Sequence, residues 1–223
     1  MNRIETTSLR GVFLQWVVGI ALAFGVATFS QAQEAISQDD PEVMISKLSE
    51  SVIAALNEQR AELEGNPSKI KEFAKHYVLP YVDTPKMARY VMGRYWRTTS
   101  DAQKNAFVEE FTTTLMRSYS QSLLKLQINR VTVKPKVVEK PGRVTVASEV
   151  EQADGNKTDV IYRAYQDKDS KKWLIYDVTV EGVSMLLNYR KTYDSEFQKL
   201  GVDAVIADMK EKNKEFNGVS LDG

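Results

Sequence analysis

The sequence predicts an α+β domain in which helices come first, four antiparallel strands follow, and two more helices end the fold. Two patterns support this order. Between residues 41 and 126, apolar residues recur every three or four positions, as on the buried face of a helix. Between residues 128 and 180, β-branched and aromatic runs are separated by short polar turns, which join antiparallel neighbours. The expected sheet is a four-stranded antiparallel meander, wrapped by about six helices.

Four helices are expected before the sheet, and residues that favour helix starts precede them. Asp40 stands directly before Pro41, Asp83 stands two residues before Pro85, and Ser100 with Gln103 fits a capping box. The expected spans are 40–65, 67–77, 83–93 and 100–126. The last of them has an apolar stripe spaced by four, made of Phe107, Phe111, Leu115, Tyr119 and Leu123.

The four expected strands are separated by turns rich in glycine, proline, aspartate and lysine. Their spans are 128–138, 143–152, 157–166 and 172–180. Glu181 and Gly182 then break the last run, and Ser184 is expected to cap the next helix. Two helices, 184–200 and 203–216, are expected after the sheet, with Gly201 between them.

The last strand has large apolar side chains on both of its faces. Strict alternation places Trp173, Ile175, Asp177 and Thr179 on one face, and Leu174, Tyr176, Val178 and Val180 on the other. A strand with two apolar faces is covered on both sides, by protein or by a ligand.

The first thirty or so residues have the pattern of an export signal. Arg3 and Arg10 flank its start, the run 12–29 is almost wholly apolar, and residues 30–32 form a small-x-small cleavage site. The favoured prediction is a cleaved signal peptide, 1–32. The alternative is an uncleaved membrane anchor, because a run of about 18 apolar residues can span a bilayer.

Composition excludes several classes of function. The chain has 30 basic and 30 acidic residues and a formal net charge of zero, so it has no basic excess for nucleic acid. It has no cysteine, and His76 is its one histidine, which excludes a thiol nucleophile and the common zinc clusters. The segment 182–186 around Ser184 lacks the final glycine of the G-x-S-x-G motif, which argues against a hydrolase serine. Neither a metal nor a cofactor is expected, and the chain is not expected to be an enzyme.

Asp177 is unusual because it is a carboxylate among apolar neighbours on a strand. The favoured interpretation is a structural carboxylate that accepts hydrogen bonds near a helix end or from an arginine such as Arg190. Catalysis is the minority alternative.

Three blocks of sequence carry a family resemblance. Residues 173–197 contain W-x-x-x-D-x-x-x-E-G-x-S followed by N-Y-R, residues 76–97 close on G-x-Y-W-R, and residues 107–123 contain F-x-x-x-F-x-x-x-L-x-x-x-Y. In this order and spacing they resemble the MlaC family of periplasmic phospholipid-binding proteins, also called toluene-tolerance auxiliary proteins. The resemblance spans roughly residues 41–213, and the chain departs from it in the turn 167–172 and in the tail.

The resemblance implies an NTF2-like (cystatin-like) lobe and a helical lobe that enclose a hydrophobic pocket, within one domain of residues 33–216 followed by a flexible tail, 217–223. From the residues alone, plain core is the favoured role of the apolar side chains. The resemblance reverses that preference, because it implies that acyl chains occupy part of this space. The expected pocket residues are Met87, Val91, Phe107, Phe111, Leu115, Tyr119, Val146, Val150, Val160, Tyr162, Tyr176, Val178, Leu187, Tyr189 and Tyr193, with Arg94, Arg97 and Lys191 at the mouth.

The resemblance also implies a function and partners. It implies a carrier in the periplasm that shuttles phospholipid between an outer-membrane lipoprotein–porin complex and the MCE-domain protein of an inner-membrane ABC transporter. Nothing in the sequence demands more than a monomer, so a monomer is expected. Two rival functions stay open: a periplasmic adaptor whose apolar residues are all core, and a small-molecule enzyme that uses Asp177 in an NTF2-like pocket.

Overall fold

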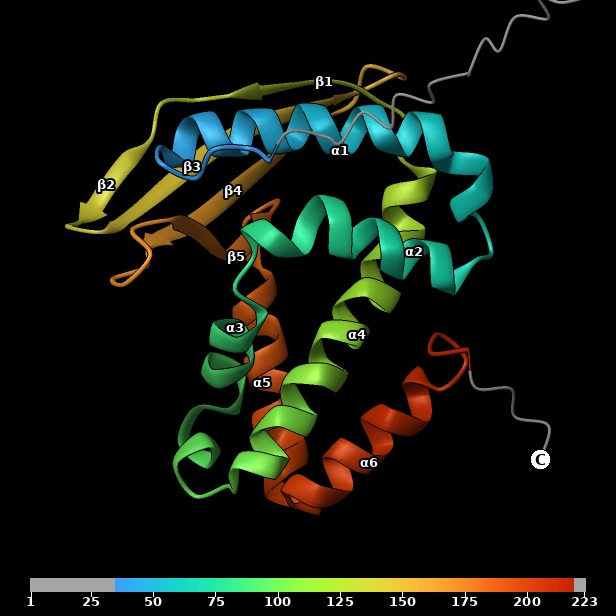
Figure 1. Ribbon diagram of the computed structural model, residues 1–223, viewed down its shortest axis with the longest axis vertical. Coiled ribbons are helices and arrows are strands. Elements are labelled where there is room, and N and C mark those ends of the chain that lie inside the picture. The colour runs from blue at the N-terminus through green and yellow to red at the C-terminus, as the bar shows by residue number, and fades with distance from the viewer. Residues whose placement is uncertain (1–34, 219–223) are drawn as a thin grey trace, which may run out of the picture. The chain divides into compact units, whose positions relative to one another are not determined.

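The computed structural model describes residues 35–218, so the predicted signal peptide and residues 219–223 lie outside the described residues. Within that part, six α-helices flank a six-stranded antiparallel sheet (Figure 1). The helices are α1 (Pro41–Leu63), α2 (Pro67–Phe73), α3 (Thr84–Met92), α4 (Asp101–Lys125), α5 (Met185–Leu200) and α6 (Val202–Asn213). The strands are β1 (Ile128–Val133), β2 (Val137–Lys140), β3 (Arg143–Gln152), β4 (Lys157–Gln166), β5 (Trp173–Val180) and β6 (Val183–Ser184).

The expected helix starts are confirmed by their caps. The Asp40 side chain accepts hydrogen bonds from two backbone N–H groups of α1, and the Asp83 side chain accepts one from the N–H of Lys86 at 2.8 Å. Ser100 and Gln103 form the predicted capping box of α4. The second helix differs from the prediction: α2 ends at Phe73, and the chain continues as a π-helical turn, η1 (Ala74–Val78), and a short 3-10 helix, η2 (Leu79–Tyr81).

The prediction of four strands was wrong in number. The expected strand 128–138 is two strands, because Pro135 has no N–H for the ladder and the chain leaves β3 there. Both pieces, β1 and β2, pair with β3. A short strand, β6, adds a sixth by pairing Thr179 with Ser184 and Val180 with Val183.

The predicted alternation along β5 was also wrong in part, because the pairing of β4 with β5 contains a bulge. Arg163 pairs with Asp177, whereas the next residue, Ala164, pairs with Ile175, so Tyr176 is the extra residue. Partners in an antiparallel pair share a face, so Ile175 lies on the face opposite Asp177. Val178, which pairs with Tyr162, shares the face of Ile175.

Helix α1 covers this Ile175 face of the sheet, while α3, α4, α5 and α6 form a helical lobe beneath it (Figure 1). Met44, Ile45 and Leu48 of α1 pack against the strands in one buried cluster. A second cluster lies among the four helices of the lobe. A third cluster joins α1 and α2 to Leu124 in the last turn of α4 and to Phe216. The core is therefore divided into parts that belong to different layers.

A buried polar network joins α4 to α6. The side chain of Asn213 is fully buried, and its amide donates to the backbone carbonyl and to a carboxylate oxygen of Glu110, at 3.0 and 2.8 Å. Arg117 donates to the Asn213 carbonyl oxygen at 3.1 Å. Each group depends on the others, because a buried polar atom that loses its partner keeps its full desolvation cost.

We expect Asn213→Ala to lower the free energy of unfolding by about 1–3 kcal/mol, because it leaves the buried Glu110 carboxylate without its amide donor. Urea denaturation followed by circular dichroism measures this loss. Asn105→Ala, on the exposed face of α4, is the matched control and should change stability little. If the two variants were equally stable, the hydrogen bonds of Asn213 would not contribute to the free energy of unfolding.

Candidate functional site

The structure distributes the predicted pocket residues over both layers. Met87, Val91, Phe107, Phe111 and Tyr193 are buried in the helical lobe, and Leu115, Tyr176 and Tyr189 pack against them partly buried. Val146, Tyr162 and Val178 instead belong to the cluster under α1. Val150 and Val160 are buried on the same face of the sheet. The last two of the set differ in exposure: Tyr119 is partly buried, and Leu187 is 52% exposed.

An aromatic cluster connects the centre of the helical lobe to its edge. The rings of Phe107 and Phe111 stack at 5.8 Å between centroids, and Tyr189 meets Phe111 edge-on at 5.3 Å. Tyr119 meets Tyr189 edge-on at 6.4 Å. Burial is the main cause that raises the pKa of both Tyr119 and Tyr193, so these phenols stay neutral. Neutral phenols present an apolar body with a hydroxyl that can face water, as the edge of an apolar site requires.

Asp177 has the structural role that the sequence favoured. It is 1% exposed, and its carboxylate accepts from the Ser184 hydroxyl at 2.8 Å and from the backbone N–H of Leu186 at 3.1 Å. The Ser184 hydroxyl in turn accepts from the N–H of Leu187, which confirms that Ser184 caps α5. The basic partner is Arg163, at 3.6 Å, rather than Arg190. The carboxylate is thus occupied in joining β5 to the start of α5.

We expect Asp177→Asn to destabilise the fold by about 1–3 kcal/mol, since an amide replaces an ionised acceptor of two buried donors. Thermal unfolding measures the effect. Asp159→Asn on the neighbouring strand is the control, because Asp159 is exposed and its ion pair with Lys134 is long, at 3.9 Å. An Asp177→Asn protein as stable as the control would return this carboxylate to the candidates for catalysis.

A cavity of about 770 Å³ opens on the outer side of α3, and we call it the α3 groove. Most of its lining comes from α3, from the 3-10 turn η3 (Gly93–Arg97) and from one residue of α5. The lining residues are Asp83, Pro85, Lys86, Arg89, Tyr90, Gly93, Arg94, Trp96, Arg97 and Arg190. The predicted mouth residues Arg94 and Arg97 therefore lie in the groove, whereas Lys191 is not among its lining residues.

Two of the sequence blocks meet in the α3 groove. Gly93 begins the G-x-Y-W-R block. Its φ is 55°, a backbone conformation that residues with a side chain rarely adopt. A Cβ added there would lie 3.3 Å from Nη2 of Arg190, the last residue of the N-Y-R block. The Arg190 guanidinium also lies 4.7 Å from the ring centroid of Tyr90. The absence of a side chain at Gly93 lets α5 place its arginine against α3.

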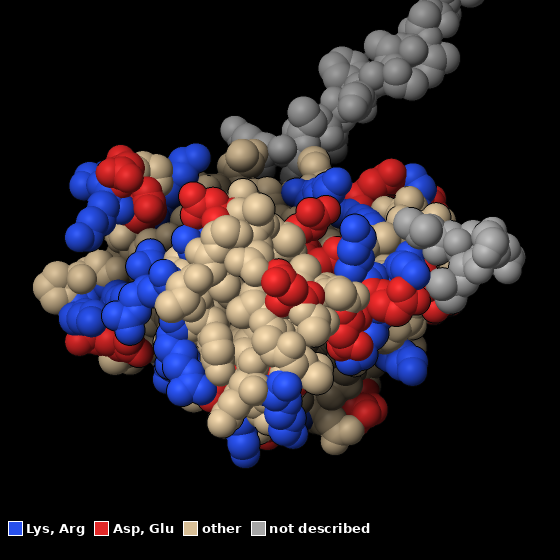
Figure 2. Space-filling view, turned by 90° about the horizontal axis from the view of Figure 1, so that it is seen from below, with Lys and Arg blue, Asp and Glu red and all other residues tan. Residues whose placement is uncertain are grey.

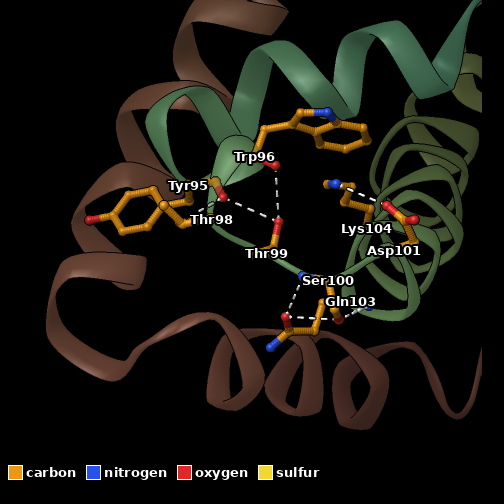
Figure 3. Close-up of polar contacts among 8 residues, drawn as sticks. All are labelled: Tyr95, Trp96, Thr98, Thr99, Ser100, Asp101, Gln103 and Lys104. Atoms are coloured by element: carbon orange, nitrogen blue, oxygen red, sulfur yellow. Dashed lines mark hydrogen bonds and ion pairs between the residues drawn. The ribbon is translucent and has the colours of Figure 1, made fainter.

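The turn η3 is held in place by hydroxyl groups that follow it (Figure 3). Thr98 and Thr99 donate to the carbonyl of Tyr95 at 3.1 and 3.2 Å, and Thr99 also lies within 3.3 Å of the Trp96 carbonyl. Lys104 pairs with Asp101 at 3.0 Å and lies over the Trp96 ring. These contacts hold the backbone of η3 and place a cation over the Trp96 ring at the groove.

The groove could have been predicted more fully from the sequence. Lys86, Arg89 and Tyr90 recur with Gly93, Arg94 and Arg97 at spacings of three and four, which is one continuous face of a helix. The same spacing places Met87 and Val91 on the opposite, buried face. The contribution of Arg190 had no such signal, because it comes from a helix about a hundred residues further along the chain.

Residues 35–218 contain no group of three or more acidic, histidine or cysteine side chains that could hold a metal ion. No helix in this range is long and apolar enough to cross a membrane.

Comparison with known proteins identifies related chains. The family described as "MlaC protein" matches residues 46–211. The intermembrane phospholipid transport system binding protein MlaC of Haemophilus influenzae is 22% identical over 192 residues, which cover 85% of this chain and 90% of that protein. The toluene tolerance protein ttg2D of Pseudomonas putida is 21% identical over 169 residues, which cover 75% of this chain and 78% of that protein.

A solved structure has the same fold. It is that of the phospholipid-binding protein from Ralstonia solanacearum in complex with a phospholipid, and it superposes with a TM-score of 0.72 at 21% identity. The match covers 80% of this chain and 99% of the other.

Proposed function

Since the chain belongs to the MlaC protein family, we propose that it is a periplasmic phospholipid carrier that holds acyl chains in its apolar interior. The observation that carries the proposal is the fold shared with the Ralstonia solanacearum protein, whose structure contains a phospholipid. The names of the two related proteins, one of a phospholipid transport system and one of toluene tolerance, support the same function.

The partly buried side chains at the edge of the aromatic cluster support this use of the interior. Leu115, Tyr176 and Tyr189 pack against the helical core without being fully covered. Tyr119 extends that edge along α4. An acyl chain that covered these side chains would add apolar burial that the protein alone leaves unused.

The energetics of transfer require an enclosed site. Exposing two acyl chains to water would cost on the order of 20 kcal/mol, at roughly 0.8 kcal/mol per methylene. An apolar cavity can nearly match the bilayer, so that uptake and release are both close to neutral. The sequence has no nucleotide-binding motif to drive transport, so its direction depends on the donor and the acceptor. We propose that the carrier exchanges lipid with an outer-membrane lipoprotein–porin complex and with the inner-membrane MCE-domain protein of an ABC transporter.

The rival enzyme function has less support. The Asp177 carboxylate is buried and already accepts from Ser184 and Leu186, which leaves it poorly placed to take a proton from a substrate. The adaptor function differs from the carrier in one measurable property, because an adaptor would contain no lipid.

We expect native mass spectrometry of the protein, purified without detergent, to show a stoichiometric mass increment that lipid extraction resolves into phospholipid. Leu115→Trp should lower that occupancy by roughly tenfold, because an indole in the ligand space costs about 1–3 kcal/mol. Val160→Trp tests the sheet side of the interior in the same way.

Leu200→Trp is the matched control for Leu115→Trp, because Leu200 is 60% exposed at the end of α5. Val137→Trp, at an exposed position of β2, is the matched control for Val160→Trp. A protein that carries no lipid even after incubation with liposomes would favour the adaptor. Variants that lose stability but keep their lipid would show that these two positions belong to plain core.

A further inference from the structure

We propose that the α3 groove is a docking site for an acidic segment of a partner protein, rich in Asp and Glu. Five cationic side chains line the groove, from Lys86, Arg89, Arg94, Arg97 and Arg190, against one carboxylate. The whole chain has a formal net charge of zero, so this excess is local and does not follow from a basic composition. A concave surface lined by one sign of charge concentrates ligands of the opposite sign.

Most of these cations lack an acidic partner within the part of the chain that the structure describes. Of the four arginines, Arg94 alone has an ion pair with a described carboxylate, at 3.6 Å from Asp194, and both side chains are more than half exposed. Hydrogen bonding to the hydroxyl of Tyr95 is the main cause that raises the pKa of Arg94. The guanidinium groups thus retain N–H donors for carboxylates, which they can bind in pairs.

The groove is separated from the apolar interior. Its lining residues are outside the buried core, and only Trp96 packs against that core from the surface. Met87, Val91 and Met92 of the same helix lie between the groove and the aromatic cluster, and each is at most 3% exposed. A lipid with its chains in the interior could not place its headgroup in the groove unless α3 moved away. The ligand therefore has to approach from outside the protein.

The cationic surface is also longer than a single headgroup needs. A second cavity, of about 480 Å³, shares Lys86 with the α3 groove and continues to Arg143 and to the turn between β4 and β5. Lys168 and Lys171 of that turn line it, together with Asp167 and Asp169. Figure 2 shows Lys and Arg gathered along one side of the lower face, where Figure 1 places α3 and this turn, beside an uncharged expanse. An extended acidic chain matches this shape.

Such a site would serve brief encounters. Exposed charges mainly raise the rate of association and add little lasting affinity, so a partner could bind and leave quickly. This inference goes beyond the proposed carrier function, because it concerns the chemistry of a partner and is tested without reference to lipid content.

The test measures fluorescence anisotropy of a fluorescein-labelled oligoglutamate peptide titrated with the purified full chain. We expect saturable binding that weakens when ionic strength rises from about 0.05 to 0.5 M, since the Debye length then falls well below 10 Å. The double variant Arg89→Glu/Arg97→Glu should bind at least roughly tenfold more weakly. An oligolysine peptide should not bind the wild-type groove.

The matched control is Lys199→Glu/Lys210→Glu, which makes the same charge change at exposed positions in the last turns of α5 and α6. It should keep the wild-type affinity. If the charge-reversed groove variant does not fold, as judged by circular dichroism, Arg89→Gln/Arg97→Gln takes its place with the same expected direction.

Four results would overturn the proposal. They are wild-type affinity in the groove variant, equal weakening in the control variant, binding only to vesicles that contain phosphatidylglycerol, and loss of bound phospholipid from the groove variant with peptide binding unchanged. The third would assign the groove to a membrane surface and the fourth to a lipid headgroup. Lipid occupancy is measured separately by mass, so a protein without lipid that still binds the peptide contradicts the carrier function alone.

Discussion

The junction between β5 and α5 determines how the two layers of this protein are joined. The bulge at Tyr176 places Asp177 on the side of the sheet away from α1, where its carboxylate accepts from Ser184 and from the first turn of α5. The start of α5 is therefore held at the sheet. Because α5 is rigid, the same contact also sets where Tyr193 enters the aromatic cluster and where Arg190 reaches α3.

A second junction positions α3 from the same strand. The backbone N–H of Asp83 donates to the carbonyl of Ile175 at 2.9 Å, and the Asp83 side chain caps α3. Neighbouring residues of β5 thus anchor two helices, one through a backbone bond and one through a carboxylate. The close approach of Arg190 to Gly93 follows from these two anchors, and any larger residue at position 93 would oppose it.

Local features of this fold could be predicted from the sequence, whereas features that depend on distant partners could not. Capping residues, turns and the apolar stripe of α4 act within a few positions, and the starts of the helices that they predict agree with the structure. The bulge in β5 depends on how β4 pairs with it, so strict alternation misplaced Ile175 relative to Asp177. For the expected pocket residues, burial of most of the apolar side chains was predictable, but their division between the cluster under α1 and the helical lobe depends on packing of the layers.

The two faces of α3 show why apolar and cationic functions can coexist in a neutral chain. If the cations of the groove opened into the interior, an acyl chain there would strip water from them, and burying an unpaired charge costs several kcal/mol. The buried row of Met87, Val91 and Met92 prevents this, because it separates the charges from the aromatic cluster within the thickness of one helix. The recognition proposed for the outer face and the apolar binding proposed for the inner face can then differ in strength independently. Only a movement of α3 itself would couple them, since this helix is the element that both surfaces share.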